Sequence, residues 1–194
     1  MKIVAALILS MALCSPAYAQ RIPPPSVPVD IEVEAGFKPF LVGHAVGTQN
    51  FICAPAPTAS GVDWLFIGPQ ATVFDATGEQ IETHFQSKNP FEPDPTKAIQ
   101  ATWQHSKDTS AVWAVKLRGS TDANYVQPGA IEWLLLEMKG AQVGPSGGEK
   151  LAGTRFIQRV NTVGGVKPPS AECTPGIVNT RRRVPYEADC YFWK

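Results

Sequence analysis

Apolar residues alternate with polar ones along much of this chain, in short segments separated by turn-forming residues. The clearest segment is the last, where Val184, Tyr186, Ala188, Cys190 and Phe192 fall on one face and mostly polar residues fall on the other. A period of two is typical of a strand with one buried face. The segment therefore predicts a half-buried strand whose apolar side, including Cys190, faces the core.

Two earlier segments strengthen the prediction of strands. Residues 79–85 also alternate, while residues 130–139 form the most apolar stretch after the amino-terminal region. Periodicity alone leaves this second segment open between a buried strand and a short helix. The Pro128-Gly129 pair before it and Gly140 after it favour a strand.

The spacing of the segments indicates the fold class. The Gly68-Pro69 pair predicts a turn between two separate strands, at residues 63–67 and 71–75. Counted in this way, the chain holds roughly nine strands, without a long helical pattern or a repeat unit. We expect an all-β domain with little helix, an antiparallel sandwich or a barrel-like structure.

The first 19 residues have the pattern of a secretory signal peptide. One lysine precedes an apolar run at residues 3–13, and Ala17-Tyr18-Ala19 has the small-x-small form that signal peptidase accepts. The run is too short to cross a bilayer as a helix. We expect cleavage between Ala19 and Gln20, and export of a soluble chain without a membrane span to the periplasm or the extracellular space.

Composition indicates how the rest of the chain is divided and which partners its charge disfavours. A proline-rich lead-in is expected at residues 20–42, since proline cannot donate to a sheet, and a single β domain at residues 43–194. The whole chain has 17 Lys and Arg against 17 Asp and Glu among 194 residues. This balance argues against a nucleic-acid partner, which requires a basic surface.

Export changes how the cysteines are interpreted, because disulfides form in oxidising compartments. Cys14 lies in the signal region, and its acylation as a lipoprotein is an alternative that the large Leu13 before it disfavours. The remaining Cys53, Cys173 and Cys190 allow one disulfide and one free thiol, and their pairing is ambiguous. A bridge from Cys53 to Cys173 would stabilise the fold by about 4–5 kcal/mol. Their spacing does not match zinc motifs.

The segment at residues 103–110 gathers several chemically active side chains. Trp103, His105, Ser106 and Asp108 include the residue types of a nucleophilic triad. Neighbouring residues on a strand point to opposite faces, however, so they do not easily form a relay. A ligand-contacting loop, or a structural turn held by side-chain hydrogen bonds at 108–110, is the alternative.

The histidines are candidate metal ligands. His84 and His105 could supply two ligands, with Asp63, Glu82 or Asp108 as a third, but none has the close spacing of a metal motif. We therefore expect no metal site and no cofactor.

A polar row at residues 158–162 is a candidate ligand surface. Alternation places Gln158 and Thr162 on one strand face, and Arg159 and Asn161 on the other. Polar side chains beside aromatic ones suit a carbohydrate or a small polar ligand. An ordinary solvent-facing row on an antiparallel sheet is the alternative.

Taken in order, a set of motifs resembles one family. The motifs are Gly47-Thr48-Gln49-Asn50-Phe51-Ile52-Cys53, Trp64-Leu65-Phe66, Thr83-His84-Phe85, Trp103 to Ser110, Ile131 to Leu136, Phe156 to Gly165 and Val184-Pro185-Tyr186. Together they resemble the domain-of-unknown-function family 3455, exported proteins of bacteria and fungi. The resemblance implies an exported, mainly β domain with no established activity. Cys190 stands where the family more often has an aromatic residue, which supports pairing of Cys53 with Cys173.

These observations favour a non-enzymatic binding module for a cell-envelope or extracellular ligand. The candidate contacts are His84, Trp103, His105, Asp108, Gln158, Arg159 and Asn161. A structural or partner-interaction module is the first alternative. A hydrolase that uses His84, His105 or Asp108 is the second.

Overall fold

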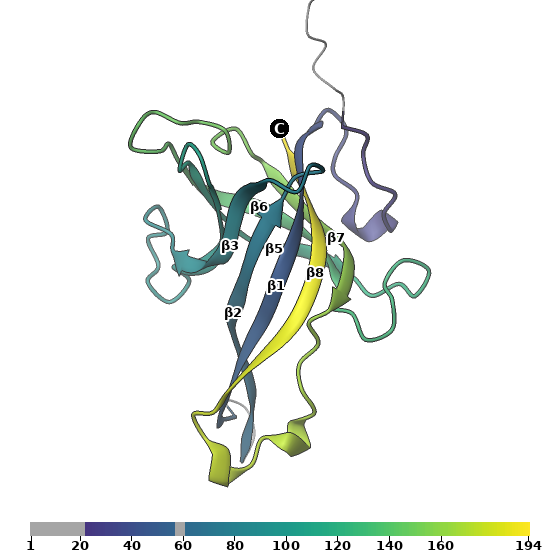
Figure 1. Cartoon of the computed structure of the whole chain (residues 1–194), viewed down its shortest axis with the longest axis vertical. Coiled ribbons are helices and arrows are strands. Elements are labelled where there is room, and N and C mark those ends of the chain that lie inside the picture. The colour runs from purple at the N-terminus through teal and green to yellow at the C-terminus, as the bar shows by residue number, and fades with distance from the viewer. Residues whose placement is uncertain (1–21, 57–60) are drawn as a thin grey trace, which may run out of the picture.

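Eight antiparallel strands form a closed barrel in the computed structural model, which describes residues 22–56 and 61–194 (Figure 1). The strands are β1 (Pro39–Pro55), β2 (Val62–Phe74), β3 (Gln80–Lys88), β4 (Ile99–His105), β5 (Ala111–Ser120), β6 (Trp133–Gln142), β7 (Phe156–Gly164) and β8 (Arg181–Trp193). Each strand pairs with its neighbour in the chain, and β1 pairs with β8 to close the barrel. The prediction of an all-β, barrel-like fold is confirmed.

The difference between eight strands and the expected nine arises at Gly68-Pro69. Instead of a turn, β2 continues through this pair, and the register shifts opposite Asn50 and Phe51 as a β-bulge. β2 pairs with β3 only from Ala71 onward, so Pro69 lies where that edge has no strand partner. Proline is tolerated on an unpaired edge because no ladder donor is needed there.

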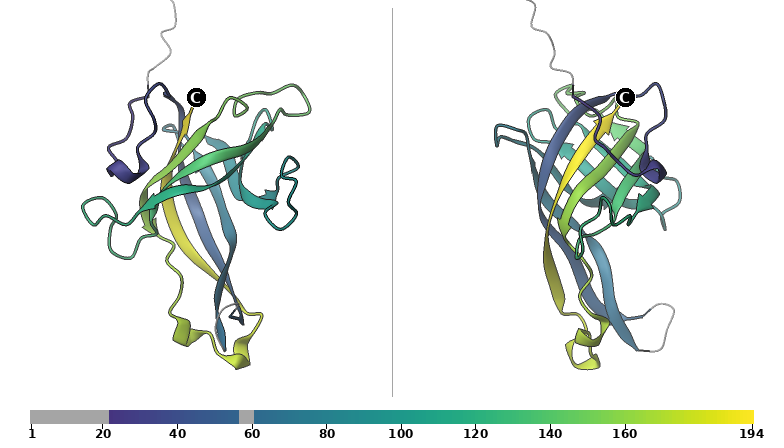
Figure 2. Two further views of the ribbon diagram at one scale, coloured as in Figure 1. Left: turned by 180° about the vertical axis from the view of Figure 1, so that it is seen from behind. Right: turned by 90° about the vertical axis from the view of Figure 1, so that its right-hand side faces the viewer.

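Three strands are longer than the others and run beyond the barrel (Figures 1 and 2). We call this part the extension: the pairing of Phe51–Pro55 with Val62–Phe66, together with the start of β8 and the short helices η2 (Ser170–Glu172) and η3 (Pro175–Ile177). It has a small core of its own, in which Phe51, Cys53, Trp64 and Cys173 are buried.

A disulfide joins the extension to the segment that covers it. Cys53 on β1 is bonded to Cys173, with the two Cα atoms 5.4 Å apart. The pairing that the resemblance supported is therefore confirmed. Cys190, the remaining cysteine of the described residues, is a buried free thiol.

The main core fills the inside of the barrel. Tyr186, Ala188, Cys190 and Phe192 on β8 point inward, as the alternation predicts, and residues 133–142 form a strand. All five tryptophans of the chain are buried, and four of them lie outside the main core cluster, which contains Trp103. The fold thus consists of strands wrapped around a core of buried side chains.

The lead-in packs against the outer face of β6 and β7. Its helix η1 (Val29–Ile31) inserts Ile31 into a second cluster with Trp133 and Val160. The Gln158 side chain donates from Nε2 to the Ile31 carbonyl at 2.7 Å. The first strand begins at Pro39, ahead of the expected residue 43.

The expected signal peptide lies outside the described residues and stays a prediction. No helix in residues 22–56 and 61–194 has the length and apolar character needed to cross a membrane.

Candidate functional site

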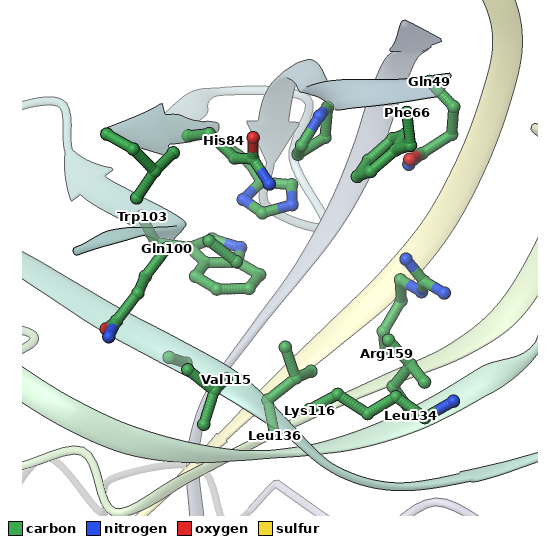
Figure 3. Close-up of a pocket in the computed structure, with 15 residues that line it drawn as sticks. Gln49, Phe66, His84, Gln100, Trp103, Val115, Lys116, Leu134, Leu136 and Arg159 are labelled. Atoms are coloured by element: carbon green, nitrogen blue, oxygen red, sulfur yellow. The ribbon is translucent and has the colours of Figure 1, made fainter. Parts of the chain in front are cut away.

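A cavity of about 280 Å³ lies on the inner side of the barrel wall (Figure 3). Strands β1 to β7 all contribute to its lining: Gln49, Phe66, Pro69, His84, Gln86, Ile99, Gln100, Ala101, Trp103, Ala114, Val115, Lys116, Leu134, Leu136 and Arg159. Eight-stranded barrels are wide enough either to be filled by side chains or to hold one small ligand. Here core side chains fill part of the barrel, and four of them, Trp103, Ala114, Leu134 and Leu136, also line the cavity.

His84 and Trp103 form one wall of this cavity. Their rings stack with centroids 3.9 Å apart, and the two side chains are 4% and 1% exposed. His84 donates from Nδ1 to the Thr102 carbonyl at 2.9 Å, which leaves Nε2 as an acceptor. Burial lowers the pKa of His84 to about 3, so the imidazole is neutral at physiological pH. The pair offers a flat aromatic surface with one acceptor.

Arg159 extends from β7 toward the opposite side of the cavity. Its Nη2 donates to the Glu132 carbonyl at 2.9 Å, while its enclosed Nε has no hydrogen-bond partner among the described residues. Burial lowers the pKa of Arg159. A guanidinium nevertheless stays charged in proteins, so the cavity carries a fixed positive charge.

Gln49 on β1 faces Arg159 across the cavity (Figure 3). Gln49 is 3% exposed, and its Nε2 finds no hydrogen-bond partner in residues 22–56 and 61–194. The hydroxyl of Tyr186 is likewise buried and unpartnered there. A Cβ atom on Gly165, whose φ is +79°, would come within 3.0 Å of both Tyr186 Cβ and Gln49 Cγ, so these two side chains are neighbours. Buried polar atoms rarely lack a hydrogen-bond partner, and a bound ligand would supply the partners that these atoms lack.

A second cavity of about 470 Å³ adjoins the first and shares Gln49, Phe66, Leu134 and Arg159 with it. The mouth carries exposed apolar side chains: Phe66 is 48% exposed and Ile99 is 61% exposed. Both cavities open near the part of β2 that has no pairing with β3. The site is therefore a trough that reaches from the surface into the barrel.

Glu82 is buried in the barrel and is 0% exposed. Neither carboxyl oxygen has a hydrogen-bond partner in the described part of the chain. Burial raises the pKa of Glu82 to about 8, so the side chain is protonated at neutral pH. It does not line either of the two cavities described above.

His105 and Asp108 belong to a structural turn. Asp108 Oδ1 accepts hydrogen bonds from the Ser110 amide and hydroxyl at 3.0 and 2.7 Å, and Oδ2 accepts from the Lys150 amide at 2.7 Å. His105 Nδ1 lies 3.2 Å from Oδ1. The Ser110 hydroxyl thus bonds to the carboxylate rather than to the imidazole, and it also accepts from the Leu151 amide. The prediction of a turn is confirmed. The Ser106 hydroxyl accepts from Gln80 Nε2 at 3.3 Å and has no hydrogen bond to His105, so these groups do not form a nucleophile–base pair.

Replacement of Asp108 by alanine is expected to lower the free energy of unfolding by about 2 kcal/mol, because three donors lose a charged acceptor. Thermal and urea denaturation measure this change. The matched control is Asp75→Ala, which removes a similar set of bonds to Thr77 and Glu79 in an exposed hairpin. Water replaces exposed partners, so the control is expected to cost at most about 1 kcal/mol. Equal losses in the two variants would contradict the structural role of Asp108.

The polar row of β7 is divided between three environments. Gln158 and Thr162 are both 1% exposed and bond to backbone carbonyls of Ile31 and Ile131, so the solvent-face interpretation is wrong for them. Asn161, with φ at +51°, lies at a bulge and donates to Asp189 on the surface. Arg159 alone of this row reaches the cavity.

Of the seven candidate contacts, the structure therefore brings His84, Trp103 and Arg159 together. His105 bonds within the 105–110 turn instead of joining His84. Among the described residues, no group of three His, Cys, Asp or Glu side chains is placed to hold a metal ion.

The sequence interpretation missed Gln49 and Phe66. Gln49 occupies an inward position in the alternation Ala45, Gly47, Gln49, and a polar residue on an apolar face is a recognisable anomaly. Phe66 gave no such indication, because its position depends on the bulge in β2.

No curated protein and no solved structure matches the sequence. A family model described as a protein of unknown function (DUF3455) matches residues 34–194, which include all eight strands. The chain therefore belongs to the DUF3455 family.

Proposed function

We propose that this protein is an exported, non-enzymatic binding protein that takes up a small organic ligand in the trough of its barrel. One observation carries the proposal: a cavity inside the barrel is lined by unpartnered buried polar atoms of Gln49 and Arg159 together with an aromatic wall. Ligand sites are typically concave and mostly apolar, with a few convergent polar groups.

Further features support binding over the alternatives. Phe66 and Ile99 expose apolar surface at the mouth of the cavity, where a ligand would cover it. The hydrolase alternative has less support, because the Ser106 hydroxyl accepts a hydrogen bond from Gln80 Nε2 at 3.3 Å and His84 packs on Trp103. Export is supported by the expected signal peptide and by the disulfide between Cys53 and Cys173.

The proposal is tested by a thermal-shift screen of aromatic acids, aromatic amides, oligosaccharides and metal ions on the processed chain. A ligand of the trough at about 100 times its Kd is expected to raise the melting temperature by about 5–10 °C, because binding to the native state adds about 2.7 kcal/mol.

The same screen on Ala101→Phe locates the binding. Ala101 lines the cavity and is partly buried, so a phenyl ring there would occupy the ligand's space. The control is Ala76→Phe, in the exposed turn before β3. We expect the first variant to lose the shift and the second to keep it. A shift that survives in Ala101→Phe, or no shift with any compound class, would overturn the proposal.

A further inference from the structure

The charged side chains around the trough leave one cation without a carboxylate. Lys116 Nζ bonds to both carboxyl oxygens of Glu132 at 2.7 Å, and Lys167 Nζ bonds to Asp63 at 2.7 Å. Glu132 is the acidic residue in the lining of the two cavities. Among the described residues, no carboxylate lies within salt-bridge distance of Arg159. A partly buried cation normally has a counter-ion, so its absence here points to a ligand that supplies one.

Around Arg159, the buried side-chain atoms that have no hydrogen-bond partner among the described residues are donors. They are the guanidinium Nε, the amide Nε2 of Gln49 and the hydroxyl of Tyr186. Burial raises the pKa of Tyr186, so its hydroxyl keeps its proton and is able to donate. A carboxylate only accepts hydrogen bonds, through two oxygens, and is the natural partner of an arginine fork beside an amide donor.

The rest of the trough is suited to an apolar body. The apolar part of the lining includes Trp103, Phe66, Leu134, Leu136 and Val115. The flat pair of Trp103 and His84 favours stacking with a planar ring. The cavity therefore combines one anion site with an apolar, partly aromatic wall.

We propose that the trough selects monocarboxylates with a planar apolar body, with the carboxylate bound by Arg159 and Gln49 and the body against Trp103. This inference rests on the proposed function and adds to it the chemical class of the ligand. Neutral compounds of the same shape fill the same space but leave the Arg159 charge without a partner, so they bind more weakly.

The test compares 1-naphthoate with 1-naphthamide, which share the ring system and differ in charge. Titration calorimetry on the processed chain at pH 7 is expected to show naphthoate binding at least about tenfold more tightly, as charged hydrogen bonds contribute 1.5–3 kcal/mol. Acetate serves as the anion without a body and is expected to bind at least about tenfold more weakly than naphthoate.

Three variants assign the preference to the site. Arg159→Gln is expected to bind the two naphthalene compounds equally. Gln49→Glu places a competing carboxylate opposite Arg159 and should lower naphthoate affinity about tenfold or more, with little change for naphthamide. Arg183→Gln, on an exposed residue of β8, is the control and should keep the preference. Gln49→Glu keeps the test decisive if Arg159→Gln does not fold.

The outcomes separate the two proposals. Equal binding of naphthoate and naphthamide by the unmodified chain would overturn the carboxylate class and leave the binding function intact. A preference unchanged in the Arg159 and Gln49 variants would overturn the class as well, because the anion would then bind elsewhere. If neither compound binds, both the class and the trough as an aromatic ligand site fail.

Discussion

Loss of the Cys53–Cys173 disulfide is expected to lower the free energy of unfolding by about 4–5 kcal/mol, the largest single effect among our predictions. The bridge closes a loop of 120 residues, and cross-linking a long loop restricts the unfolded chain most strongly. Urea denaturation of Cys53→Ala/Cys173→Ala measures the loss. The extension has only a small core besides the bridge, so its amides should also exchange with solvent faster.

Treatment of the same proteins with a reductant provides the control for this experiment. Dithiothreitol should lower the stability of the unmodified protein to that of the double variant, which itself should not respond. Cys190→Ala, which keeps the bridge, should respond as the unmodified protein does. If reductant leaves the unmodified protein unchanged, the disulfide contributes no measurable stability and the prediction is wrong.

Glu82→Gln is expected to stabilise the protein at pH 7 by about 3 kcal/mol. Burial raises the pKa of Glu82 from 4.5 to about 8, so the unfolded state releases the proton above pH 4.5 while the folded state keeps it. Stability therefore falls by about 1.4 kcal/mol for each pH unit between these values. Glutamine has nearly the shape of the protonated acid and does not titrate.

His84 has the opposite dependence. Its pKa is lowered from 6.5 to about 3, so the unfolded state binds the additional proton and stability rises with pH across that interval. The two effects offset each other between pH 4.5 and 6.5. Above pH 6.5 only Glu82 acts, and the unmodified protein should lose roughly 2 kcal/mol by pH 8.

Thermal denaturation from pH 6 to pH 8 checks this prediction. Glu82→Gln should show a flat profile above pH 6.5, whereas Glu79→Gln, a variant of an exposed glutamate in the turn before β3, should follow the unmodified protein. Parallel profiles for the unmodified protein and Glu82→Gln would show that Glu82 does not keep its proton in the folded state.

Alternation was sufficient to predict the strands, because the barrel buries one face of each. The inward row of β8 follows from it directly, whereas the strand at 133–142 was favoured by the Pro128-Gly129 pair before it and Gly140 after its apolar run. The turn expected at Gly68-Pro69 was wrong for a reason that no local pattern contains: the edge of β2 is unpaired there, so proline fits within a strand. Closure of the sheet is likewise a property of distant pairing between β1 and β8.

The candidate site was predictable only in part. His84, Trp103 and Arg159 were chosen from their chemistry, but nothing local indicated that β3, β4 and β7 face one cavity. Gln158 was expected to contact a ligand, but its side chain bonds to the carbonyl of Ile31 in the lead-in, a residue 127 positions away. No local pattern indicates such a distant partner. Which strands share one cavity depends on closure of the barrel, and closure is not a feature of any one segment.

The pairing that closes the barrel also determines where the carboxyl end of the described chain emerges. Lys194 exchanges two backbone hydrogen bonds with Lys38, of 2.9 and 3.1 Å, at the end of the barrel remote from the extension (Figure 1). An affinity handle or a solid support attached after Lys194 therefore leaves the end of the barrel that carries the extension unobstructed. Protein immobilised in this orientation presents the exposed Phe66, at the mouth of the trough, to dissolved compounds.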